Sequence, residues 1–129
     1  MSWDYAYKCI IAATMWLVIW NATPSMAADA AWRDSYALEA AGKYAAASSS
    51  LDSVAATSPD YDFVLMRRGW LNYLQGKHND AIREYNQALN ANPKSLEAML
   101  GLMLPLMAQQ RWREAGAMAR KVIAASDRK

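Results

Sequence analysis

The side chains that could perform acid–base or metal chemistry are few and widely spaced in this chain. The one histidine, His78, stands next to Asn79 and Asp80, and one histidine with one nearby carboxylate is a poor ligand set for a metal ion. Glu84 and Glu114 are too far apart in the sequence to indicate a catalytic carboxylate pair. The sequence has no glycine-rich phosphate loop and no nucleophile elbow. We therefore expect no enzyme activity, no cofactor and no metal site.

The composition favours a single helical domain without a strongly charged surface. The 14 basic and 12 acidic residues give a net charge of +2, which is too small to indicate nucleic-acid binding. Apolar residues make up 54% of the chain. Among them alanine, which favours helix, and methionine, which fills irregular gaps, are frequent. Because no stretch alternates apolar and polar residues as a strand would, we predict an all-α fold.

The N-terminal residues 1–27 differ from the rest of the chain. Their apolar run, from Cys9 to Trp20, is shorter than the roughly 20 residues that span a bilayer. Small residues at Ser25 and Ala27 suit cleavage by a signal peptidase. We predict a signal peptide over 1–27, which touches the membrane only transiently, and hence a periplasmic or secreted protein. An uncleaved amphipathic segment that anchors the chain to the membrane is the alternative.

A spaced set of small and aromatic residues lies in the middle of the chain. Its members follow one another at intervals of seven, five, four, three and five: Gly69, Gly76, Ala81, Tyr85, Ala88 and Pro93. The pattern resembles the tetratricopeptide repeat, a helix–turn–helix unit of about 34 residues. Ala47 and Ala115 lie one repeat length before and after Ala81. Gly42 likewise lies one repeat length before Gly76. The spacing predicts three repeats, at 28–61, 62–95 and 96–129.

The resemblance implies an α–α superhelix of three stacked helical hairpins over residues 28–129. The small residues Ala47, Ala81 and Ala115 would let the two helices of each hairpin approach closely. Gly42 and Gly76 would occupy turns that need a positive φ. The first repeat would also begin where the predicted signal peptide ends.

Several residues depart from the family pattern. Asp34 and Arg68 occupy equivalent places in neighbouring repeats, so we predict an ion pair between them; the alternative is that Asp34 turns to solvent. Pro105 falls inside the first helix of the third repeat, where we expect a kink or a break. We expect His78 to be a half-buried structural ring and the neighbouring Asn79–Asp80 pair to cap the helix that follows.

In the repeat family, the first helices of the hairpins line a concave groove that binds peptides. The resemblance places eight apolar or aromatic residues in that groove here: Trp32, Tyr36, Phe63, Met66, Trp70, Tyr73, Leu100 and Leu104. The basic residues with which some members grip carboxylates are absent from the matching places. An apolar or amphipathic segment therefore fits better. The alternative is that the aromatic stripe is helix-packing core.

These features predict an exported adaptor or scaffold that binds another protein or peptide. Two alternatives remain open on the sequence alone. The chain could self-assemble into homo-oligomers through an uncovered C-terminal helix, on which Met118, Val122 and Ile123 lie. It could also carry a small ligand in the aromatic groove. The repeat and the N-terminal segment would look the same in all three cases.

Overall fold

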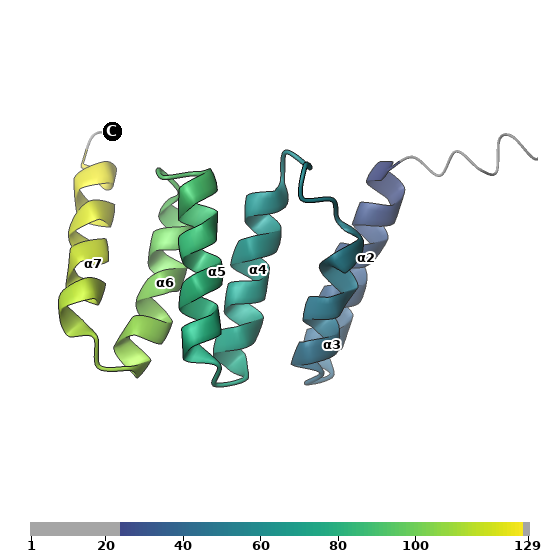
Figure 1. Cartoon of the computed structure of the whole chain (residues 1–129), viewed down its shortest axis with the longest axis horizontal. Helices are drawn as coiled ribbons and strands as arrows, with labels where there is room; N and C mark the ends of the chain where they lie inside the picture. The colour runs from purple at the N-terminus through teal and green to yellow at the C-terminus, as the bar shows by residue number, and fades with distance from the viewer. Residues whose placement is uncertain (1–23, 128–129) are drawn as a thin grey trace, which may run out of the picture.

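The computed structural model describes residues 24–127, and every regular element in this part of the chain is a helix. In order these are α2 (Pro24–Ala40), α3 (Tyr44–Ser49), the 3-10 helix η1 (Ser50–Ser53), α4 (Tyr61–Leu74), α5 (His78–Ala91), α6 (Leu96–Ala108) and α7 (Trp112–Ser126). The helices stand in a row with α2 and α3 at one end and α7 at the other (Figure 1). The predicted all-α fold of helical hairpins is confirmed.

The turn inside each hairpin has the same backbone geometry. The residues Gly42, Gly76 and Gln110 follow α2, α4 and α6, with φ of 74°, 72° and 59°. Each next amide, on Lys43, Lys77 and Arg111, donates to a carbonyl five residues earlier at 2.8–2.9 Å. Glycine adopts this conformation without steric cost, whereas glutamine does so at about 1–2 kcal/mol. The two glycine turns are confirmed, and the third hairpin keeps their geometry without a glycine.

The small residues of the repeat lie where the helices of each hairpin meet. Ala47, Ala81 and Ala115 are each the fourth residue of a second helix, and all three are buried. Any larger side chain there would push the paired helices apart, because interiors have no spare volume. The hairpins therefore keep one phase along the chain, as the sequence predicts.

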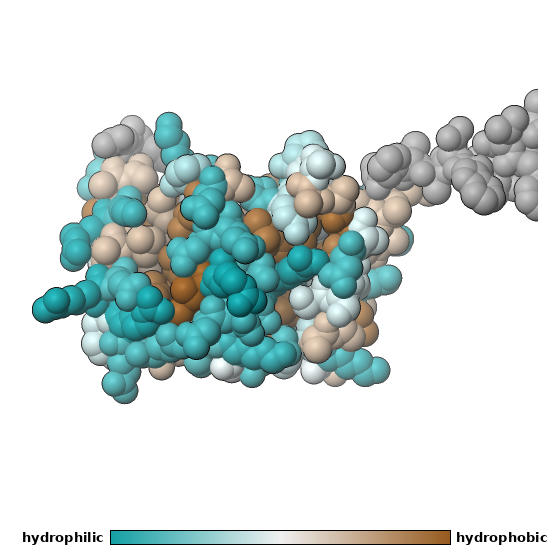
Figure 2. All heavy atoms as spheres, in the orientation of Figure 1, coloured by the Kyte–Doolittle hydropathy of each residue, from teal (hydrophilic) through white to brown (hydrophobic). Residues whose placement is uncertain are grey.

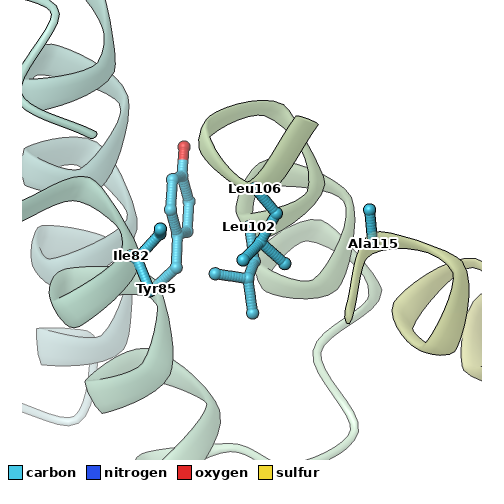
Figure 3. Close-up of a cluster of buried hydrophobic side chains, with 5 residues drawn as sticks. All are labelled: Ile82, Tyr85, Leu102, Leu106 and Ala115. Atoms are coloured by element: carbon cyan, nitrogen blue, oxygen red, sulfur yellow. The ribbon is translucent and has the colours of Figure 1, made fainter. Parts of the chain in front are cut away.

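The second and third hairpins share the largest apolar cluster. Ile82 and Tyr85 of α5 face Leu102 and Leu106 of α6, and Ala115 of α7 lies beyond them (Figure 3). Burying each leucine stabilises the fold by roughly 1.5–3 kcal/mol. Because this cluster draws on three consecutive helices, it joins the second hairpin to the third.

The first hairpin is less regular than the other two. Its second helix, α3, has six residues before the chain tightens into η1. The hydroxyls of Ser49 and Ser50 bond to backbone carbonyls of the preceding turn, at 3.1 and 2.7 Å. Such bonds compete with regular helix, which explains the early end. A small apolar cluster still joins this hairpin to α4 through Ala31, Leu51 and Val64.

Of the kink or break expected at Pro105, the structure rules out the break, and the kink stays a prediction. Helix α6 runs without interruption from Leu96 to Ala108, and Pro105 is buried inside it. The proline removes one backbone hydrogen bond, but the packing of Leu102 and Leu106 on either side holds the helix together.

The N-terminal prediction lies mostly outside the described residues. Residues 1–23 of the predicted signal peptide are not among them, and helix α2 begins at Pro24. The predicted cut before Ala28 would fall inside this helix, so cleavage stays a prediction. None of the helices within residues 24–127 combines the length and the hydropathy needed to cross a bilayer.

One face of the molecule is mainly hydrophilic. In the view of Figure 2, hydrophilic side chains cover most of α5, and hydrophobic atoms show only in small patches beside it. The exposed residues of α5 include Arg83, Asn86, Gln87 and Asn90. This solvated surface therefore offers little apolar area to a ligand.

Candidate functional site

An open groove of about 550 Å³ lies where α2 faces α4. Its lining comes from α2, from α4 and the residue before it, from α5 and from the start of α6: Trp32, Tyr36, Asp60, Phe63, Met66, Arg67, Trp70, Tyr85 and Glu97. The lining residues of α2 are four positions apart, and those of α4 lie within the i, i+3, i+4, i+7 pattern of one helix face, so each helix turns one face to the groove. The volume is within the range of sites that hold a ligand or a few peptide side chains.

Two aromatic rings on opposite helices remain exposed in this groove. Tyr36 of α2 is 56% exposed and Phe63 of α4 is 51% exposed. Tyr36 stacks on Trp32, with ring centroids 6.4 Å apart. Large apolar side chains exposed on facing helices form a surface that gains free energy when a partner covers it.

The side chain of Arg67 ties α4 to α2 beneath the groove. Its Nε donates to the Ser35 hydroxyl at 3.2 Å and its Nη2 to the Ser35 carbonyl at 3.3 Å, while Nη1 pairs with Glu39. Its guanidinium carbon lies 4.0 Å from the centre of the Tyr36 ring. Arg67 is 9% exposed, and a guanidinium buried to this degree needs such partners. We call Ser35, Glu39, Arg67 and Trp70 the polar seam.

Trp70 completes the polar seam and also forms part of the groove wall. Its indole nitrogen donates to Glu39 at 2.8 Å, so one carboxylate receives both Trp70 and Arg67. A second cavity of about 490 Å³ shares Arg67 and Trp70 with the groove and is lined also by Tyr44 and Leu74. Residues of the polar seam therefore line two hollows along the contact of the first two hairpins.

The ring of Tyr85 adjoins the groove from α5 and is held between two glycines. An added Cβ at Gly69 of α4 would lie 2.8 Å from the ring, and one at Gly101 of α6 would lie 2.3 Å from it. Both positions must therefore lack a side chain. Burial raises the pKa of the Tyr85 hydroxyl to about 12, because the phenolate would lose its hydration. We call Gly69, Tyr85, Gly101, Leu102 and Leu106 the aromatic seam.

The structure brings together five of the eight residues predicted for the groove. These are Trp32, Tyr36, Phe63, Met66 and Trp70. Whether they bind a peptide stays a prediction. The sequence did not predict Asp60, Arg67 and Tyr85 as lining residues of this groove.

Three predicted residues lie apart from the groove lining. Tyr73 packs its ring against Trp70 at 5.8 Å and against His78 at 5.7 Å. Leu100 is exposed on α6 and Leu104 is partly buried there. The α6 residue that lines the groove is Glu97, in the first turn of the helix.

The predicted ion pair between Asp34 and Arg68 is wrong. Arg68 bonds instead to Asp52 of η1 at 2.6 Å, and Asp34 is exposed to solvent, which was the alternative. One residue along a helix changes the direction of a side chain by about 100°. It is therefore the neighbouring Arg67 that reaches α2, where it meets Ser35.

The loop before α5 also differs from expectation. His78 is half-buried, as predicted, and its Nδ1 has no hydrogen-bond partner. Neither Asn79 nor Asp80 caps the helix: the Asn79 side chain accepts from Gln109 at 2.7 Å, and Asp80 pairs with Arg83. Within residues 24–127, no three side chains of the metal-binding types come together.

These observations define a protein built of stacked helical hairpins with an aromatic groove between the first two. The tetratricopeptide repeat family model matches residues 63–95, which hold most of α4, all of α5 and the turn after them. This middle hairpin is therefore similar to a tetratricopeptide repeat, as its sequence predicted. The assignment of the other two hairpins as repeats stays a prediction, supported by their common phase. No curated protein matches the sequence.

Proposed function

We propose that this protein is an adaptor that binds an apolar or amphipathic peptide segment of another protein in the groove between α2 and α4. Tetratricopeptide repeats generally mediate protein–protein interactions. The observation that carries the proposal is the exposure of Tyr36 and Phe63 on the two sides of one hollow. Aromatic side chains of this kind often dominate the free energy of protein interfaces.

The shape of the groove favours a peptide over a compact partner surface. The lining residues of α2 and α4 lie along the two helices, so an extended chain between them could contact Trp32, Phe63 and Trp70. The partly buried Met66 adds a flexible side chain that adapts to different apolar groups. The N-terminal sequence pattern supports an exported protein, with its partner in the periplasm or outside the cell.

A photo-crosslinking residue placed at Phe63 of the full chain tests this proposal. The matched control carries the same residue at Trp112, which is 61% exposed on α7 and does not line the groove. The expected result is a protein captured from Phe63 but not from Trp112, with the link mapped to one short segment. Equal capture from both sites would contradict the proposal.

The mapped segment, made as a synthetic peptide, then gives the binding energy. We expect Phe63→Ala to weaken its Kd by about tenfold or more, as an interface anchor does. Trp112→Ala should leave the Kd within about twofold, because a distant site contributes independently. Calorimetry on both variants measures this difference.

Self-association through α7 is a second candidate function. Trp112 and Ile123 on this helix are 61% and 59% exposed, and both face away from the cluster that α6 and α7 share. Light scattering on the full chain, over a range of concentrations, tests for self-association. A concentration-dependent dimer that Ile123→Glu abolishes would support self-association, and a monomer at all concentrations would contradict it.

A further inference from the structure

The structure points to the charge of the bound segment: we propose that the peptide carries a lysine or arginine at the end of the groove where α4 and α6 begin. This inference rests on the proposed function and adds the chemical class of the partner segment. It follows from which charges in the groove lining are already neutralised and which are not.

The single basic residue of the groove lining is not available to a ligand. Arg67 uses Nε and Nη2 on Ser35 and Nη1 on Glu39, and its ring contact with Tyr36 covers one face. Releasing it to bind an acidic peptide would leave the Glu39 carboxylate without its partner. An anionic ligand therefore has no free cation to meet in this groove.

The two acidic residues of the lining, unlike Arg67, form no ion pair within residues 24–127. Asp60 precedes α4 and makes no side-chain bond to cap it. Glu97 lies in the first turn of α6, where its only polar contact is the Ser95 hydroxyl at 3.4 Å. Both side chains are exposed.

The two helix N-termini near these carboxylates offset their charge only in part. Each helix start is equivalent to roughly +0.5 of an elementary charge. Two carboxylates and two helix starts then leave a net charge of about −1 at this end of the groove. A cationic side chain would be attracted to it, while its apolar neighbours on the peptide cover Phe63 and Met66.

A random peptide library displayed on phage and selected against the purified full chain tests the charge. We expect the enriched sequences to combine aromatic or aliphatic residues with a lysine or arginine at a fixed spacing from them. Enriched peptides that lack basic residues, or that carry acidic ones instead, would overturn the inference. Enrichment of no peptide, or of peptides whose Kd does not change with Phe63→Ala, would instead overturn the proposed function.

Charge removal in the groove gives the second readout. The variant Asp60→Asn, Glu97→Gln should weaken the Kd of a selected peptide by about fivefold at low salt, the effect expected for two exposed ion pairs. Asparagine suits a helix start as well as aspartate does, so folding is preserved. The difference from wild type should shrink as salt is added.

The matched control removes two carboxylates that do not line the groove. Asp34 is exposed on α2 and Asp127 is exposed after α7, so Asp34→Asn, Asp127→Asn changes the net charge equally. We expect its Kd to stay within about twofold of wild type. Equal weakening by both double variants would overturn the inference, because it would show a response to net charge alone.

Discussion

The polar seam and the aromatic seam occupy equivalent places in successive hairpins, yet one is hollow and the other is closed. Tyr85 fits between Gly69 and Gly101. One repeat earlier, the same two places hold Ser35 and Arg67, which bond to each other. Two glycines let an aromatic ring fill the contact, whereas a long charged side chain bridges it and leaves a groove beside it.

This difference separates the roles of the two contacts. The aromatic seam buries apolar side chains from α5 and α6 and contributes mainly to stability. The polar seam holds α2 and α4 together while Tyr36 and Phe63 stay exposed. Changes in the aromatic seam should therefore alter folding most, and changes around the polar seam should alter binding most.

The largest expected effect is the loss of the ring that fills the aromatic seam. Tyr85→Ala should lower the free energy of unfolding by about 3–5 kcal/mol, the range for large buried side chains. Urea denaturation followed by circular dichroism measures it. Tyr36→Ala is the control, with a loss below about 1 kcal/mol because its ring is half exposed. Equal losses would contradict the division of roles.

A methyl group added to the aromatic seam should also destabilise the protein. Gly101→Ala would place its Cβ against the Tyr85 ring, which cannot move away because Gly69 lies close on the other side. We expect a loss of about 2 kcal/mol from overpacking, measured by the same denaturation. A gain near 1 kcal/mol, as alanine gives in an unconstrained helix, would contradict this packing.

Removing the charge from the polar seam tests whether the bridge holds α2 in place. Arg67→Met should cost about 2 kcal/mol, less than for a fully buried pair because the Glu39 side chain is 23% exposed. In a double-mutant cycle with Glu39→Gln, the two losses should fall short of additivity. Strict additivity would show that the pair contributes nothing to the contact.

The raised pKa of Tyr85 predicts a smaller effect of alkaline pH. The hydroxyl titrates near 10 when unfolded and at about 12 in the folded protein. Its contribution is therefore fully present below pH 10 and is lost as the pH rises toward 12. We expect wild type to lose about 1 kcal/mol more than Tyr85→Phe between pH 9 and 11. If the free energy of unfolding fell equally with pH in the two proteins, this prediction would be contradicted.

The hairpins and their phase were predictable because they depend on local requirements. Ala47, Ala81 and Ala115 mark the tight contact within each hairpin, and Gly42 and Gly76 mark turns with positive φ. Each signal acts within one repeat, so a single sequence is enough to find it.

The detail of the groove was not predictable in the same way. Arg67 rather than Arg68 enters the polar seam, and Tyr85 reaches the groove from a second helix. Both outcomes depend on the distance and rotation between helices, which side chains of two repeats set jointly. Tyr73 shows the same limit, since the neighbouring rings of Trp70 and His78 draw it away from the lining.

The most direct test of the central claim is the response of individual indole N–H signals to a bound peptide. Trp32 and Trp70 line the groove and Trp112 does not, so nuclear magnetic resonance can compare them in one titration of the full chain. Our account predicts that the Trp32 and Trp70 signals shift in parallel with binding while the Trp112 signal stays in place. A shift of Trp112 alone would contradict it and would place the binding surface on α7.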